Sequence, residues 1–192
     1  PVRALQWRSE DLVFTSMDAL TRSLAEPPKR AGLQRARPGE DELALARLSH
    51  YDEIRQMEPR GQALRLLWDV CQIPDFRKTA LDQHARLLGD IYLQLAEDGR
   101  IKDDWLAPRV ARLERTDGDI DAISARIAHV RTWTYLSHRA DWLENAPYWQ
   151  EKARSIEDSL SDALHEKLTQ RFVDRRTSVL LKKLKDDAPL LA

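Results

Sequence analysis

The longest regular pattern of apolar and polar residues lies near the end of the chain, between Pro147 and Lys185. Its apolar positions are separated by steps of three and four residues, which places them on one face of an α-helix. They are Trp149, Ala153, Ile156, Leu160, Ala163, Leu164, Leu168, Phe172 and Val179. Pro is favoured at the first helical position, and no later Pro or Gly interrupts the segment. The pattern predicts a helix about 58 Å long, with residues 157–161 the favoured place for a bend.

The same spacing predicts shorter helices in the preceding part of the chain. Ser16 is suited to cap the first of them, Thr79 with Asp82 forms a capping box, and Gly99 marks a helix end. The expected helices cover residues 17–25, 40–57 with a break near 49–52, 62–72, 79–98, 102–114 and 119–138. No segment alternates with period two for long enough to indicate a sheet. We therefore expect an all-α protein, an irregular bundle of about six or seven helices with one long C-terminal helix.

Punctuation by Pro and Gly divides the chain into three parts. Residues 1–39 form an entry segment with a short helix and a linker rich in Pro and Arg, residues 40–146 a helical bundle, and residues 147–192 the long helix. The linker at 27–39 holds three prolines, two glycines and four cations. A basic loop could contact nucleic acid, but this composition favours a plain linker.

Composition limits the classes of function that fit. Charged residues make up 33% of the 192 residues and hydrophobic residues 42%, values typical of a soluble globular protein. The net charge is −1, so contact with nucleic acid would have to come from a local patch. The single cysteine excludes an internal disulfide and fits a reducing compartment, which favours the cytoplasm. No apolar run is long enough for a membrane span, and the start without Met indicates a piece of a longer protein.

The second half of the long helix provides such a local patch. Between Leu164 and Lys185 there are seven Lys or Arg residues and two acids. Five of the cations fall within an arc of about 80° at 100° per residue. They are Lys167, Arg171, Arg175, Lys182 and Lys185. Leu168, Phe172 and Val179 line the adjoining arc, which we expect to pack. The cations form either a solvated face or a surface for phosphate or an acidic partner.

Motifs that would indicate a catalytic site, a cofactor or a metal do not occur in this sequence. It has no GxxxxGK[ST] loop, no GxGxxG and no HExxH, and the histidine spacing fits no zinc site. Cys71 lies on an apolar helical face and favours a buried small hydrophobe over a nucleophile. His138, Arg139 and Asp141 favour a structural turn over acid–base catalysis. Trp133, Trp142 and Trp149 could stack on bases, but packing where helices meet is the commoner use. We therefore predict no catalytic residue and no metal ligand.

Three runs of residues resemble a known family. They are LWDVCQIPDFRK at 67–78, RTDGDID at 115–121 and LSDALHEKLTQRFVDRR at 160–176. These runs are similar to bacterial relatives of the mitochondrial degradosome RNA helicase, the Suv-three-like branch of superfamily 2 helicases. The entry helix at 16–24, ahead of the prolines, resembles the helix that follows the second RecA-like domain of these proteins. The resemblance covers nearly the whole chain.

The resemblance implies an ATP-driven helicase that acts on RNA or DNA–RNA duplexes, with a helical C-terminal region that closes over the strand. ATP and Mg²⁺ would belong to the motor of the parent protein. This sequence departs from the family in one decisive respect, because no ATP-binding, DExH or arginine-finger motif can be matched to any of its positions. The chain therefore resembles the region that follows the motor, with an accessory role.

Two functions remain open at this stage. In the first, the chain is an accessory region that guides single-stranded RNA or DNA and braces the motor domains of the same parent chain. In the alternative, it is a protein-interaction scaffold that docks a nuclease or the motor and does not contact nucleic acid. Salt-dependent binding to single-stranded RNA distinguishes the two.

Overall fold

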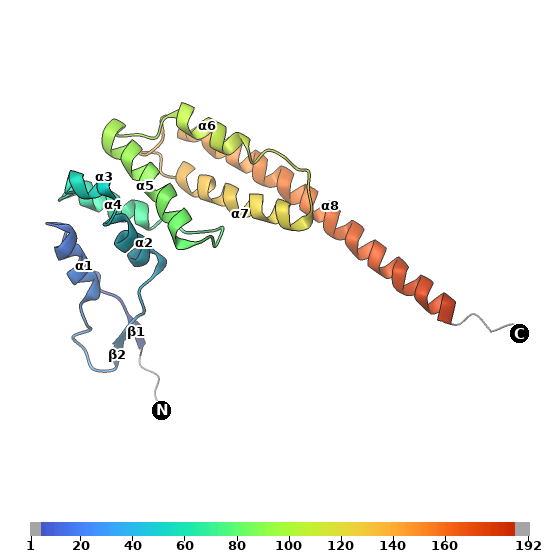
Figure 1. Cartoon of the computed structure of the whole chain (residues 1–192), viewed down its shortest axis with the longest axis horizontal. Coiled ribbons are helices and arrows are strands. Elements are labelled where there is room, and N and C mark those ends of the chain that lie inside the picture. Colours follow the sequence, from blue (N-terminus) through green and yellow to red (C-terminus); the bar gives the residue numbers. More distant parts are fainter. Residues whose placement is uncertain (1–4, 187–192) are drawn as a thin grey trace, which may run out of the picture.

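The computed structural model describes residues 5–186, with side chains described as far as residue 184. The described chain is an irregular bundle of helices with one long C-terminal helix, which confirms the all-α prediction (Figure 1). The elements are β1 (Leu5–Trp7), α1 (Met17–Ala25), β2 (Leu33–Arg35), α2 (Glu40–Leu48), α3 (Asp52–Met57), α4 (Gln62–Cys71), α5 (Leu81–Asp98), α6 (Asp103–Ala111), α7 (Ile120–Ser137) and α8 (Ala146–Asp186). The described residues form eight helices rather than six or seven, since α2 and α3 are separate at the expected break.

One apolar core connects the elements from α1 to the first half of α8. Leu20 of α1, Leu48 of α2, Leu67 of α4 and Tyr92 of α5 are completely buried in it. Trp68 is 5% exposed and lies on the inward face of α4 together with Leu64 and Cys71. Contacts of α2 with α4 and α5, and of α4 with α5, form the N-terminal half of this core.

Two of the predicted helix ends follow the expected chemistry and one does not. The Ser16 hydroxyl accepts a hydrogen bond from the backbone N–H of Ala19 (3.1 Å), and Gly99 closes α5 in the left-handed region at φ +73°. The carboxylate of Asp119 accepts from the backbone N–H of Ala122 (2.8 Å). The predicted capping box at Thr79 is wrong, because the backbone N–H and hydroxyl of Thr79 both bind the Asp75 carboxylate (2.9 and 3.2 Å). Thr79 therefore belongs to the preceding turn, and α5 begins at Leu81.

The segment expected as a linker, residues 27–39, contains a short strand. β2 pairs in parallel with β1, with Leu5 opposite Leu33 and Trp7 opposite Arg35. Each strand has only three residues, which is too short for an alternating pattern to be visible in the sequence. Ion pairs from Arg8 to Asp41 (3.0 Å) and from Arg35 to Glu42 (3.0 Å) connect this small sheet to the start of α2.

α6, α7 and the first part of α8 form the C-terminal half of this core. α7 and α8 pack side by side in opposite directions, since Gln150 near the start of α8 donates to the Ser137 carbonyl at the end of α7 (2.8 Å). Trp149 anchors the start of α8 by donating its indole N–H to the Asp103 carboxylate (2.7 Å). α8 continues without interruption through residues 157–161, so the expected bend is absent (Figure 1). Leu160, within that segment, is completely buried in the core.

Candidate nucleic-acid interface

The second half of α8 projects away from the rest of the protein (Figure 1). In the first half, Trp149, Ala153, Ile156 and Leu160 are at most 5% exposed. From His165 to Leu184 every residue is exposed. We call residues 165–184 the arm. The arm is helical although none of its side chains is buried. Its side chains are therefore available to solvent or to a partner.

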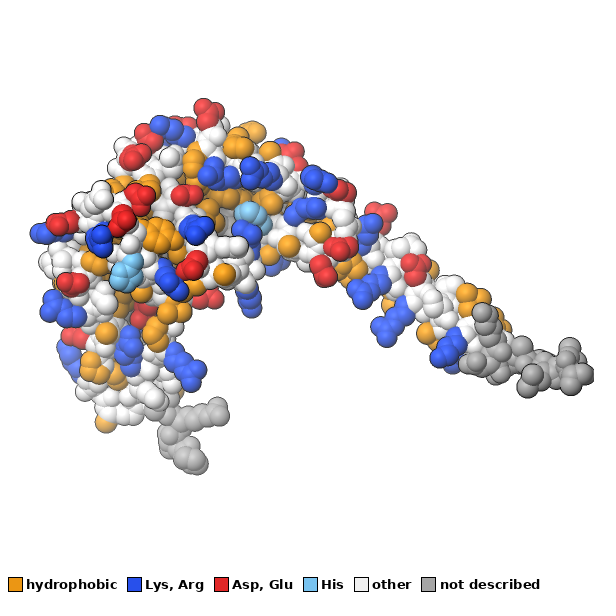
Figure 2. Space-filling view, in the orientation of Figure 1, with side chains coloured by type: hydrophobic (Ala, Val, Ile, Leu, Met, Phe, Trp, Pro, Cys, Tyr) orange, Lys and Arg blue, Asp and Glu red, His pale blue; other side chains and the backbone are white. Residues whose placement is uncertain are grey.

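The unbroken helix places the predicted cations on one side of the arm. We call Lys167, Arg171, Arg175, Lys182 and Lys185 the cation row. Four of the five side chains are exposed, and within the described residues none of these four forms an ion pair. The side chain of Lys185 lies outside the described part of the chain. Figure 2 shows Lys and Arg side chains at intervals along the projecting helix.

The cation row continues the same face of α8 that is buried upstream. At 100° per residue, Trp149, Ala153, Ile156 and Leu160 occupy an arc of about 60° that overlaps the arc of the row. This face is apolar where it is buried in the core and becomes cationic further along the helix. The face changes from apolar to cationic at the point along α8 where α7 begins. Residues 118–121 at the start of α7 line a hollow together with Lys167 and Arg171.

Negative charge accompanies the inner end of the row. Asp119 and Asp121 line the same hollow as Lys167 and Arg171 (the Asp119 carboxylate also caps α7). The neighbouring Asp117 pairs with Arg115 (2.6 Å), and this hydrogen bond lowers the pKa of the Asp117 carboxyl below its usual value. Arg175 and Lys182 lie further along the arm, beyond these acids. Arg175 and Lys182 form no ion pair among the described residues, so they remain available to an approaching polyanion.

The expected packing of the apolar arc next to the row is wrong. Leu168 is 47% exposed, Phe172 65% and Val179 52%. The structure also exposes four apolar residues that the sequence analysis did not single out, namely Val173, Leu180, Leu181 and Leu184. The sequence contains one indication of this exposure, because the apolar residues after Leu164 occur around most of the helix rather than on one face. The helical period identifies an apolar stripe, but it does not reveal whether this chain covers it.

The other candidate residues have structural roles. Cys71 is buried, and burial raises the pKa of its thiol, so it is not poised to act as a nucleophile. Arg139 stacks on the Trp142 ring (4.0 Å) and pairs with Asp69 (3.7 Å) and Asp141 (3.8 Å). His138 hydrogen-bonds through Nδ1 to the Thr134 carbonyl oxygen (2.7 Å). This segment is therefore a structural turn.

The tryptophans near the start of α8 pack in the core. Trp133 and Trp142 are 3% exposed and Trp149 is 5% exposed, so none of the three offers a ring face to a base. Trp105 is half-buried, meets Trp133 edge to face at 6.2 Å between ring centroids and is covered by the Arg109 guanidinium at 3.7 Å. Packing is therefore the use of these rings, as the sequence favoured.

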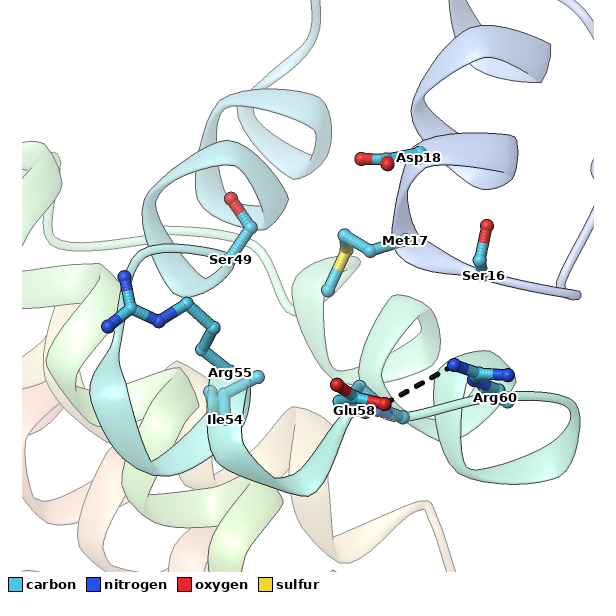
Figure 3. Close-up of a pocket in the computed structure, with 9 residues that line it drawn as sticks. Ser16, Met17, Asp18, Ser49, Ile54, Arg55, Glu58 and Arg60 are labelled. Atoms are coloured by element: carbon cyan, nitrogen blue, oxygen red, sulfur yellow. Dashed lines mark hydrogen bonds and ion pairs between the residues drawn. The ribbon is translucent and has the colours of Figure 1, made fainter.

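A hollow between the start of α1 and α3 is lined by Ser16, Met17, Asp18, Ser49, Ile54, Arg55, Glu58, Pro59 and Arg60 (Figure 3). Three of its four charged side chains form ion pairs, and Asp18 forms none among the described residues. Arg60 pairs with Glu58 (3.2 Å), and Arg55 pairs with Asp52 (2.9 Å). The lining thus offers no unpaired cluster of charge that would select a ligand.

Among the described residues, no two glycines with positive φ lie close together in the sequence, and no cluster of metal-ligating side chains is found. The glycines with positive φ are Gly32, Gly61, Gly99 and Gly118, which stand singly and cannot form a loop of consecutive amides around phosphates. Within residues 5–186, no three His, Cys, Asp or Glu side chains are grouped so that they could hold a metal.

None of the helices in this range is both long and apolar enough to cross a membrane. No family model, curated protein or solved structure matches the chain.

Proposed function

We propose that this chain is an accessory region of an ATP-dependent RNA or DNA helicase and that its arm guides the single strand. The body, residues 40–146 with the entry segment, would brace the motor domains of the parent protein. ATP and Mg²⁺ would be held by that motor. The helicase context is supported by the resemblance of residues 67–78, 115–121 and 160–176 to the Suv-three-like helicases.

The observation that carries the proposal for the arm is the placement of the cation row. Lys167, Arg171, Arg175 and Lys182 share one side of an exposed, uninterrupted helix and have no ion-pair partner among the described residues. Cations held at intervals along a rod can follow a phosphate backbone, and their binding releases counterions from the strand. The expected activity is weak, sequence-independent binding of single strands that falls as salt rises.

The test is a titration of a single-stranded oligouridylate at several salt concentrations between roughly 50 and 200 mM. Arg171→Gln together with Arg175→Gln should flatten the slope of log affinity against log salt by about 1.4, since each phosphate contact on a single strand contributes about 0.7. Gln is nearly as good a helix former as Arg, so the helix should persist. The matched control is Arg176→Gln with Lys183→Gln, which removes the same charge from the arm outside the row.

Equal slopes for the row variant, the control and the parent chain would contradict the proposal. We also expect the isolated chain to hydrolyse no ATP, because it has no loop that could hold a triphosphate. Hydrolysis above a contaminant-controlled blank that is lost on mutating residues of this chain would overturn the accessory role.

The alternative function, a scaffold that docks the motor or a nuclease without contacting nucleic acid, is favoured by one specific observation. Phe172 and Leu184, both on the arm, are 65% and 67% exposed. Exposure of large apolar side chains to water is unfavourable, and it is more typical of a protein-binding surface than of one that contacts only phosphate. If the row variant leaves strand binding unchanged but loosens association with the motor domains, the row is a docking surface.

A further inference from the structure

The arm carries an apolar seam with cations on both sides. We call Leu168, Phe172 and Val179 the seam. At 100° per residue these three residues fall within an arc of about 40°. Arg171, Arg175 and Lys182 lie on one side of that arc, and Arg176 and Lys183 lie on the other. Both acids of the arm, Glu166 and Asp174, lie on the opposite half of the helix.

The seam has the spacing of a helix-pairing surface. Leu168, Phe172 and Val179 follow one another at steps of four and seven, which matches the d, a, a positions of a heptad pattern. In that register Arg171 occupies a g position, Arg175 and Lys182 occupy d positions between the apolar residues, and Arg176 and Lys183 occupy e positions. Residues at e and g decide which partner a helix accepts, whereas the apolar contacts at a and d supply most of the affinity.

The charges on both sides of the seam disfavour a second copy of the chain as the helix that packs on the seam. Residues 165–184 contain six Lys or Arg and two acids. In a parallel pair, Arg171 of one copy would face Arg176 of the other, and in an antiparallel pair each cationic flank would meet itself. Like charges across such a seam destabilise the pair. A helix with carboxylates beside its apolar stripe meets no such repulsion.

We infer that the seam docks an acidic amphipathic α-helix of a partner protein. The apolar side chains of that helix would cover Leu168, Phe172 and Val179, which are 47 to 65% exposed in the chain alone. Its carboxylates would pair with the cations on both flanks. The methylene stems of Arg175 and Lys182 lie next to the seam and extend its apolar surface.

The docked helix also excludes the single strand from part of the cation row. Arg171, Arg175 and Lys182 belong both to the row and to one flank of the seam, so a helix on the seam and a strand on the row compete for them. This second consequence rests on the proposed function. The docking itself does not, because it depends on the exposed apolar residues.

A designed peptide provides the probe. It would be about 28 residues long, enough for stable helicity, with Leu at the positions that face the seam and Glu at the flanking positions. The matched control peptide carries Lys in place of every Glu. Fluorescence anisotropy with the full chain should show the Glu peptide binding at least about tenfold more tightly than the Lys peptide, as expected from opposite and like charges at e and g.

Substitutions on the two sides of the arm separate the surfaces. Leu168→Ser with Phe172→Ser should weaken the Glu peptide at least about tenfold and leave oligouridylate binding unchanged. Leu180→Ser with Leu184→Ser removes equally exposed apolar residues outside the seam and should change neither affinity. Arg171→Gln with Arg175→Gln should weaken both ligands. If the unsubstituted chain binds the Glu peptide but not oligouridylate, the proposed function fails and the docking inference stands.

Three results would overturn the inference. In the first, neither peptide binds or both bind equally. In the second, the Leu180 and Leu184 substitutions weaken the Glu peptide as much as the seam substitutions do. In the third, the chain without peptide is a dimer in sedimentation and the Phe172→Ser substitution dissociates it, which would make a second copy the occupant.

Discussion

The two halves of α8 share one helix but differ in what surrounds them. Trp149, Ile156 and Leu160 in the first half are buried, whereas Leu168, Phe172 and Leu180 in the second half are 47 to 65% exposed. Both halves have a helical spacing of apolar residues, and no Pro, Gly or break separates them. The difference arises because the first half lies against the body and the arm does not. Periodicity alone is therefore insufficient to decide which surface of a helix is core and which is interface.

The largest expected effect distinguishes the body from the arm. Trp68→Ala should lower the free energy of unfolding by about 3–5 kcal/mol, the usual cost of deleting a large buried aromatic side chain. Phe172→Ala on the arm should change it by less than about 0.5 kcal/mol, since an exposed side chain loses no packing. Urea denaturation of both variants measures these values. A Trp68→Ala variant as stable as the parent would show that the inward face of α4 has been misassigned.

A second comparison lies within α8 itself. Leu160→Ala should cost about 2–5 kcal/mol, because the completely buried side chain leaves a cavity in the core. The matched substitution Leu180→Ala removes the same atoms from a residue that is 55% exposed, and it should leave the midpoint of urea unfolding nearly unchanged. Similar losses for the two variants would mean that the arm is packed in solution, against another molecule or against the body.

The dependence of stability on pH gives a third comparison. Burial, with a smaller contribution from the charge of Arg77, lowers the pKa of His129 on α7 to about 4. The unfolded chain therefore binds a proton at this residue between its ordinary pKa of about 6.5 and pH 4 while the folded chain does not. Stability should be fully present above pH 6.5 and should fall as the pH is lowered through this window.

Replacement of His129 by Gln should reduce that fall, as followed by thermal unfolding at several pH values. His165→Gln is the control on the arm, where the side chain is exposed, and it should leave the pH dependence as it is in the parent chain. An unchanged pH dependence in the His129→Gln variant would contradict the assignment of this effect to the half-buried imidazole.

The sequence predicted most of the helices because their determinants are local. The cap at Ser16, the stop at Gly99 and the break between α2 and α3 each depend on a few adjacent residues. The strand at Leu33–Arg35 was missed since its pairing partner lies 28 residues earlier and neither strand is long enough to show alternation. Thr79 was misassigned because Asp75 competes for its hydroxyl. Such competition between neighbours is not visible in a capping motif.

The candidate site was only partly predictable for a similar reason. Helical spacing is sufficient to place Lys167, Arg171, Arg175 and Lys182 on one side of α8. The exposure of the neighbouring apolar residues depends on where α7 begins relative to α8, and this is a property of the tertiary structure. The acids beside Lys167 and Arg171 likewise come from residues 118–121, far away in the sequence.

The central claim, that the arm rather than the body contacts the single strand, is tested most directly by amide hydrogen exchange with and without oligouridylate. The amides of an exposed single helix open locally and should exchange faster than those of the buried helices. We expect added oligouridylate to slow exchange between residues 165 and 184, and to a smaller extent at residues 118–121. Slower exchange confined to residues 40–117, with the arm unaffected at saturating oligouridylate, would contradict the account.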